Sequence, residues 1–199
     1  MPADMCAHLV LASGSPRRQE LLRQIGVEFH VHVVDMDESM LPGEAVITHV
    51  KRLALEKARA GYRLACEPIN GCVALGADTV VEIDGDVLGK PQDARQAGAF
   101  LARLSARKHR VHTAVAVVTS ATEQIALSSS EVEFTRLSEQ QIDRYVKTGE
   151  PLDKAGAYAI QGVGGQFIIN LNGSYSGVMG LPLYETVELL VACGLRCAI

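Results

Sequence analysis

Short apolar runs alternate with amphipathic segments along most of the chain, and this alternation limits the folds that the sequence can adopt. β-Branched runs bounded by turn residues predict strands, and apolar residues at three- and four-residue spacing predict helices. The dipeptide Asp84-Gly85 between two strand-like runs is a strong hairpin signal. Since hairpins pair strands antiparallel and helical crossovers pair them parallel, we expect an α/β fold around a mixed sheet.

Capping residues mark where several helices begin. Ser15 precedes Pro16, Asp93 precedes a helical run, and Ser138 with Gln141 fits a capping box. The expected strands are 8–12, 28–34, 73–75, 79–83, 87–88, 110–119, 124–134 and 167–171, and the expected helices are 16–24, 44–65, 93–104, 138–147 and 182–192. No linker or repeat interrupts this series, so we predict a single domain over residues 1–199.

Bulk composition restricts the partners. The formal net charge is -4, whereas proteins that bind long nucleic acids usually carry a strongly basic face. No apolar run approaches the roughly 20 residues that span a bilayer, and no basic region precedes the first apolar stretch as in a signal peptide. We therefore expect a cytoplasmic protein without a membrane or long nucleic acid partner.

The five cysteines are odd in number and form no C-x-x-C pair, so we expect reduced thiols. Cys193 and Cys197 lie one helical turn apart, a spacing for which packing is a simpler explanation than metal or redox chemistry. The cysteines are Cys6, Cys66, Cys72, Cys193 and Cys197.

The segment from Ser13 to Arg18 leads from the first expected strand through a small-residue turn into a helix. Free backbone N–H groups at a helix N-terminus form an anion site, and Gly14 lets a phosphate approach closely. Arg17 and Arg18 oppose the helix dipole in that first turn, and such a broken local rule is typical of a functional site. The alternative is an ordinary turn with solvated arginines. The P-loop pattern is absent.

Acidic and basic residues from distant stretches could complete a phosphate site. Glu38 lies in an acidic loop at 35–43, and Asp78 follows an apolar run, which predicts a position at a sheet's end. Mg²⁺ is normally held by one or two carboxylates plus substrate phosphates. Lys57 falls at the apolar spacing of its helix and Lys90 follows the hairpin. Each of these residues alone is more often a solvated surface group.

Two further patterns concern ligands. A glycine- and alanine-rich block, 150–165, contains Gln161, whose amide can pair with the O4 and N3 groups of uracil or thymine; a compact set of turns is the alternative. His30 and His32 alternate on one expected strand, but two ligands do not make a tight zinc site. We interpret these histidines as solvent-facing.

Together these stretches closely resemble the Maf family of nucleotide pyrophosphatases. The resemblance covers nearly the whole chain in the family's order, with no departure at the motif positions. The matching stretches are LASGSPRRQELLRQIGVEF (11–29), DMDE (35–38), RLALEKARA (52–60), LGADTVV (75–81), LGKPQD (88–93), EPLDKAGAYAIQGVGG (150–165) and NGSYSGVMGLPLYET (172–186).

The resemblance implies a Maf/ITPase-like fold, which is a twisted mixed sheet with flanking helices and a deep cleft. It also implies cleavage between the α and β phosphates with Mg²⁺ or Mn²⁺. The family's aspartate falls on Asp78, as general base or metal-assisted activator of water. Other conserved polar positions fall on Ser13, Arg18, Glu38, Lys57 and Lys90, and positions that track base specificity fall on Arg17, Thr79 and Gln161.

This combination resembles the branch that hydrolyses dTTP and UTP, and modified pyrimidine triphosphates are also candidate substrates. Our hypothesis is that Glu38 and Asp78 bind a divalent metal, with Lys57 and Lys90 contributing to catalysis. Ser13, Arg17, Arg18, Thr79 and Gln161 would bind the substrate. The alternatives are a pyrophosphatase for 7-methyl-GTP or another nucleotide, and a nucleotide-binding regulator of cell division, since the family is associated with septum inhibition. A homodimer follows from the resemblance only.

Overall fold

The computed structural model of the protein describes residues 8–67, 69 and 71–198. The chain divides into two compact units. Among the described residues, the first unit comprises those up to Asp78, Thr113–Leu127 and those from Gly180 onward, and the second comprises Thr79–His112 and Ser128–Met179. The single domain expected over 1–199 stays a prediction, as does the deep cleft.

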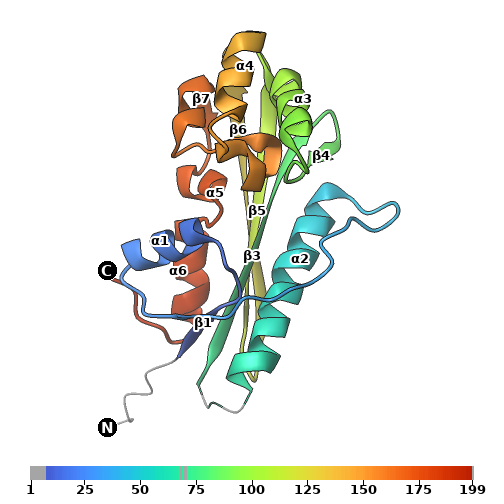
Figure 1. Ribbon diagram of the computed structural model, residues 1–199. Helices are drawn as coiled ribbons and strands as arrows, with labels where there is room; N and C mark the ends of the chain where they lie inside the picture. Colours follow the sequence, from blue (N-terminus) through green and yellow to red (C-terminus); the bar gives the residue numbers. More distant parts are fainter. Residues whose placement is uncertain (1–7, 68, 70, 199) are drawn as a thin grey trace. The chain divides into compact units, whose positions relative to one another are not determined.

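The sheet is mixed, as predicted. In the described part of the chain its strand order is β2-β1-β3-β5-β6-β7, and β4 pairs with β3 (Figure 1). β1 runs parallel to both β2 and β3, whereas the pairs β3–β4 and β6–β7 are antiparallel. The strands are β1 (Leu9–Leu11), β2 (His30–Val31), β3 (Val73–Ile83), β4 (Asp86–Leu88), β5 (Lys108–Val118), β6 (Glu123–Phe134) and β7 (Ile168–Asn172).

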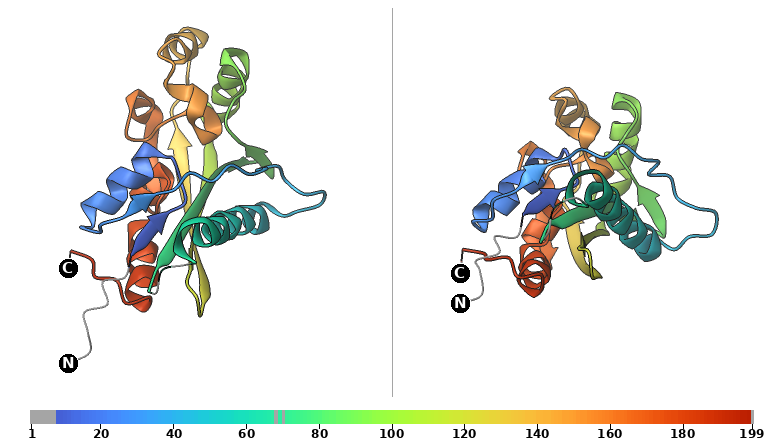
Figure 2. Two further views of the ribbon diagram at one scale, coloured as in Figure 1. Left: turned by 60° about the horizontal axis from the view of Figure 1, so that its bottom comes forward. Right: turned by 90° about the horizontal axis from the view of Figure 1, so that it is seen from below.

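The first unit contains helices α1 (Pro16–Gln24), α2 (Val46–Gly61) and α6 (Leu183–Ala192). α2 continues into a π-helical turn, η1 (Tyr62–Cys66), and lies along the sheet (Figures 1 and 2). Two glycines allow this close approach: a Cβ at Gly61 would lie 2.8 Å from the Cβ of Ala12, and one at Gly76 would lie 2.3 Å from the carbonyl oxygen of Ala54. α2 is therefore packed with its backbone against β1 and β3.

The second unit contains α3 (Ala94–Leu104), α4 (Glu139–Val146) and α5 (Tyr175–Met179), and three 3₁₀ turns named η2 (Glu150–Asp153), η3 (Ala155–Ala157) and η4 (Val163–Phe167). α3 and α4 lie side by side (Figures 1 and 2). Both predicted caps form: Asp93 accepts a hydrogen bond from the Gln96 backbone, and Ser138 with Gln141 makes a capping box. An apolar core that includes Leu101, Val132 and Phe134 fills the unit.

Several predicted boundaries were wrong. The runs 73–75 and 79–83 form one continuous strand, β3, because Gly76 serves the approach of α2 and does not break the strand. The strand predicted at 28–34 is reduced to His30–Val31, and the helix predicted at 44–65 begins at Val46 and becomes π-helical at Tyr62. Ser15 occupies the N-cap position of α1, but its side chain makes no cap hydrogen bond.

The cysteine prediction also needs correction. Cys66 and Cys72 form a disulfide, which joins the end of η1 to the residue before β3, whereas Cys193 and Cys197 are unbonded. Cys6 and the segment considered for a signal peptide, up to residue 7, lie outside the described residues. A search of the described helices finds none with both the length and the apolar character needed to cross a membrane.

Candidate functional site

The turn between β1 and α1 fixes one arginine of the predicted phosphate site. Arg18 donates from Nη1 to Ser13 Oγ at 3.0 Å and from Nε to the carbonyl oxygen of Gly180 at 2.8 Å. Ser13 Oγ also accepts a hydrogen bond from the backbone N–H of Ser15 at 3.3 Å. Arg17 lies next to Arg18 in the first turn of α1, which contains no acidic residue. The two cations therefore lie at a helix N-terminus, where backbone N–H groups also favour anions.

Lys57 lies between the two predicted acids. Its Nζ is 2.6 Å from Glu38 Oε1 and 2.7 Å from Asp78 Oδ1. The Lys57 and Asp78 side chains are each 9% exposed, whereas that of Glu38 is 44% exposed. We call Glu38, Lys57 and Asp78 the lysine–carboxylate cluster. Its buried end is an ion pair and its exposed end is a carboxylate that water or a ligand can reach.

Arg18 interacts electrostatically with the two carboxylates of this cluster. Burial lowers the pKa of its guanidinium, and the negative charges of Asp78 and Glu38 oppose that shift. Arginine remains protonated at physiological pH despite such a shift. The structure thus brings Ser13, Arg18 and the lysine–carboxylate cluster together within the first unit.

Strand geometry explains why Asp78 meets Lys57. Side chains two residues apart point to the same face of a strand, so Asp78 shares a face with Gly76. The missing side chain at Gly76 lets the backbone of α2 pass directly over that face, at Ala54 and Ala58, and this places Lys57 beside Asp78. The prediction that Asp78 lies at a sheet's end was wrong, because it lies in the middle of β3.

A second network, which the sequence did not reveal, anchors the loop that carries Glu38. Glu44 accepts hydrogen bonds from Arg52 Nε at 2.7 Å and Nη2 at 2.8 Å, and Arg52 Nη2 also donates to the carbonyl oxygen of Ser39 at 3.1 Å. The bonds from Arg52 lower the pKa of Glu44 to about 2. Because Ser39 adjoins Glu38, Arg52 ties this part of the loop to α2. The separation of eight residues, across the start of a helix, gave no sequence signal.

The donor atoms fit a divalent metal that arrives with a substrate. Glu38 and Asp78 contribute carboxylate oxygens, the ligands that Mg²⁺ and Mn²⁺ prefer, and they converge on one ammonium group. The described residues contain no group of three His, Cys, Asp or Glu side chains suited to a metal, including around His30 and His32. A complete protein cage is thus missing from the part of the chain that the structure describes.

The other predicted residues belong to the second unit. Lys90 follows Gly89, whose carbonyl oxygen accepts a hydrogen bond from the backbone N–H of Gly156 at 3.1 Å. Thr79 follows Asp78 on β3 and, since side chains alternate along a strand, points to the opposite face of that strand. Gln161 is exposed between η3 and η4. The glycine- and alanine-rich block folds as short 3₁₀ turns, and the binding roles of these three residues stay predictions.

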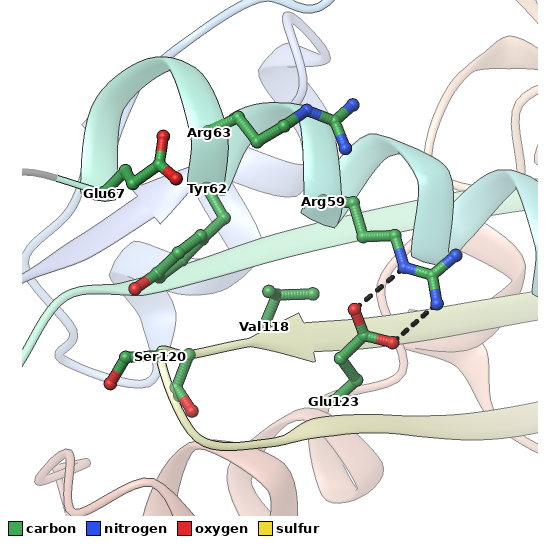
Figure 3. A pocket seen from close by; sticks show the side chains of 8 residues that line it. Arg59, Tyr62, Arg63, Glu67, Val118, Ser120 and Glu123 are labelled. Carbon is green, nitrogen blue, oxygen red and sulfur yellow. Dashed lines mark hydrogen bonds and ion pairs between the residues drawn. The ribbon is translucent and has the colours of Figure 1, made fainter.

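An open groove of about 740 Å³ also occurs in the first unit (Figure 3). Arg59 donates two hydrogen bonds to Glu123 across it, at 2.8 and 2.7 Å, and the ring of Tyr62 borders it. None of the residues predicted to bind nucleotide or metal lines this groove. It is therefore distinct from the lysine–carboxylate cluster.

Comparison with known proteins gives consistent matches. The sequence matches the family model described as Maf-like protein over residues 8–193. A dTTP/UTP pyrophosphatase of Pseudoalteromonas atlantica is 51% identical over 182 residues, which cover 92% of this chain and 95% of the relative. Proteins of the same name from Aromatoleum aromaticum and Escherichia coli O157:H7 are each 50% identical, and the matches cover 94% and 92% of this chain and 96% and 91% of the relatives.

Proposed function

The chain belongs to the Maf family, and on this premise we propose that it is a pyrophosphatase that hydrolyses dTTP and UTP to the monophosphate and pyrophosphate. The observation that carries the proposal is the lysine–carboxylate cluster, which lies in the electric field of Arg18. Relatives that are about half identical over most of the chain bear the corresponding name. A nucleotide-binding regulator would have no need for two carboxylates that meet beside a cationic turn.

The side chains of the cluster and the basic turn have separate tasks in this mechanism. Arg17, Arg18 and Lys57 bind the negative charge of the triphosphate, which increases on the leaving pyrophosphate as the bond breaks. Lys57 occupies Asp78 Oδ1 and thereby fixes the orientation of that carboxylate. Oδ2 then accepts a hydrogen bond from the attacking water and receives its proton, a contribution worth about 10²–10⁴ in rate.

Glu38 and Asp78 would hold the divalent metal together with the substrate phosphates. When bound, Mg²⁺ or Mn²⁺ neutralises phosphate charge and makes bound water more acidic. Glu38 suits this task because its exposed carboxylate can reach a metal that enters with the nucleotide. Arg52 holds the adjoining backbone, so Glu38 need not be ordered anew for each substrate.

Base selection is assigned by the resemblance to Arg17, Thr79 and Gln161, and a further phosphate contact to Lys90. The amide of Gln161 can donate to O4 and accept from N3–H of uracil or thymine. Cytosine and adenine present the reverse pattern, an amino donor beside a ring nitrogen acceptor, and would leave these polar groups without partners, which disfavours their binding. The same pairing would accept a modified pyrimidine whose O4 and N3–H groups are intact.

The cellular setting is also part of the proposal. We place the enzyme in the cytoplasm, where nucleoside triphosphates are made and used, and expect a homodimer. The structure joins Cys66 to Cys72, whereas a reducing compartment disfavours such a bond, so differential alkylation of the protein in intact cells tests this location. Light scattering coupled to gel filtration measures the oligomeric state.

A substrate panel tests the proposed reaction. The protein is incubated with dTTP, UTP, GTP and 7-methyl-GTP in Mg²⁺ or Mn²⁺, and monophosphate and pyrophosphate are measured. The proposal predicts both products in equal amounts from dTTP and UTP, with the purine nucleotides far slower. Release of orthophosphate, or a preference for 7-methyl-GTP, would contradict it.

A further inference from the structure

One hydrogen-bonded pair in the second unit holds the turn that carries Gln161. The Tyr145 hydroxyl donates to Glu150 Oε1 at 2.6 Å and accepts from the backbone N–H of Ala159 at 3.2 Å. Glu150 Oε2 accepts from the N–H of Val163 at 3.0 Å, and Oε1 accepts from the N–H of Gly164 at 3.0 Å. The pair therefore binds backbone both before and after Gln161. We call residues 159–164 the Gln161 turn.

Close packing makes this arrangement specific to its residues. A Cβ at Gly162 would lie 2.4 Å from Glu150 Oε2, so a side chain there would displace the carboxylate. A Cβ at Gly164 would lie 2.5 Å from the Tyr145 hydroxyl oxygen. The two glycines thus let the backbone of the Gln161 turn approach the pair directly.

The charge of Glu150 strengthens the hold on the turn. Burial alone would raise the pKa of Glu150, but hydrogen bonds from Tyr145, Gly164 and Val163 outweigh it and lower the pKa. Burial, with the nearby Glu150 carboxylate, raises the pKa of Tyr145, so its hydroxyl remains a donor at physiological pH. Hydrogen bonds to an ionised acceptor are roughly twice as strong as those between neutral groups.

We propose that Tyr145 and Glu150 are positioning residues for base selection, because they fix the Gln161 turn and thereby the direction of the Gln161 amide. This inference rests on the proposed function, in which Gln161 reads the pyrimidine edge. Gln161 itself is exposed, so its own burial does not order it. Selection between bases depends on amide geometry, whereas the lysine–carboxylate cluster lies in the other unit. Loosening the turn should therefore change the preference among nucleotides more than the rate with dTTP.

Two conservative variants test the inference. Glu150→Gln keeps the size of the side chain but replaces one acceptor oxygen with an NH₂ group that faces a backbone donor. Tyr145→Phe keeps the ring, which packs edge-on against Phe167, and removes only the hydroxyl. The matched control is Tyr184→Phe, because Tyr184 is 74% exposed. Each variant should lower the ratio of kcat/KM for dTTP to that for CTP, whose base presents the reverse donor–acceptor pattern, about tenfold, and the control should leave it unchanged.

A double-mutant cycle with Gln161→Ala separates positioning from a general structural effect. If Glu150 acts through Gln161, then Glu150→Gln has no further effect on the dTTP/CTP ratio once Gln161 is alanine. An equal loss of selectivity in both backgrounds, or an unchanged ratio in both Glu150→Gln and Tyr145→Phe, would overturn the inference.

Hydrogen exchange tests the positioning role separately from the proposed reaction, because it is measured without nucleotide. Glu150→Gln should speed exchange of the Val163 and Gly164 amides in the protein without nucleotide, whereas Tyr184→Phe should not. If wild-type protein does not hydrolyse dTTP, the proposed function fails, and the role in base selection fails with it even where exchange is faster. If dTTP is hydrolysed and exchange is unchanged, only the positioning role is overturned.

Discussion

The two units contain two kinds of carboxylate network, and the contrast indicates what each is for. In the first unit, Glu38 and Asp78 share one ammonium group, and the Glu38 side chain is 44% exposed. In the second unit, both carboxylate oxygens of Glu150 accept hydrogen bonds, from backbone N–H groups and a tyrosine hydroxyl. The first arrangement keeps charge available for chemistry, whereas the second uses charge to fix the shape of a turn.

Apart from the loss of Asp78 itself, the largest effect should come from the cation shared in the first unit. Lys57→Met should lower kcat/KM about 10²–10³-fold for every nucleotide, because it removes charge that the transition state needs. It also leaves Asp78 buried without its partner, which should reduce the free energy of unfolding by about 3 kcal/mol. Urea unfolding and steady-state rates measure the two effects. Lys51→Met, on the same helix, is the control, and a rate like wild type in Lys57→Met would refute the role of the cluster.

A smaller and selective effect is expected in the second unit. Gln161→Ala should reduce the preference for dTTP over CTP about tenfold, because cytosine no longer meets a mismatched amide. The rate with dTTP should fall less than in Lys57→Met. Initial rates with dTTP, UTP and CTP measure this, and an unchanged order and ratio of the three would show that Gln161 does not read the base.

A weaker effect on activity is expected from Arg52, which supports the loop beside Glu38. Arg52→Met should raise the metal concentration needed for half-maximal activity several-fold, about the effect of one lost charge-assisted hydrogen bond. Arg59→Met is a matched control on the same helix, because its pair with Glu123 is exposed and such pairs contribute about 0–1 kcal/mol. Activity measured against the concentration of Mg²⁺ or Mn²⁺ distinguishes the two variants. The same half-maximal concentration in both would mean that Arg52 does not support the metal site.

The smallest effect is a pH dependence of stability. The folded-state pKa of Glu44 is lowered to about 2 from an ordinary 4.5, so its stabilising contribution is complete above pH 4.5. That contribution is lost as pH falls from 4.5 towards 2. The melting temperature of the wild-type protein should therefore fall as pH is lowered across this window. Glu44→Gln should reduce this dependence of the melting temperature on pH. If melting temperature changed with pH in the same way in wild type and Glu44→Gln, Glu44 would not be the cause of the pH dependence.

Local chemistry made much of the fold predictable. Pro16 and the residues after it predicted α1, and Asp84-Gly85 predicted the hairpin. Ser138 with Gln141 predicted the start of α4. The 3₁₀ turns of the glycine-rich block could only be expected as turns, because their conformation depends on contacts such as that of Gly156 with Val81. Periodicity and turn signals describe neighbours in sequence, so they fail where distant segments meet.

The site was predictable in composition but not in arrangement. Asp78 was expected at a sheet's end because it follows an apolar run, but β3 continues through it and Gly76 permits the approach of α2. Residues that only support others gave no signal: Arg52 and Glu150 act through backbone atoms that no motif identifies. The Cys66–Cys72 bond was missed because a spacing of six residues matches no common pattern.

Asp78→Asn tests the central claim, which is that the lysine–carboxylate cluster hydrolyses the nucleotide. The variant keeps the size of the side chain and should remain folded by circular dichroism. Product release from dTTP, followed by ³¹P NMR with saturating Mg²⁺ or Mn²⁺, should slow about 10²–10⁴-fold. Turnover at the wild-type rate in the folded variant would contradict the account.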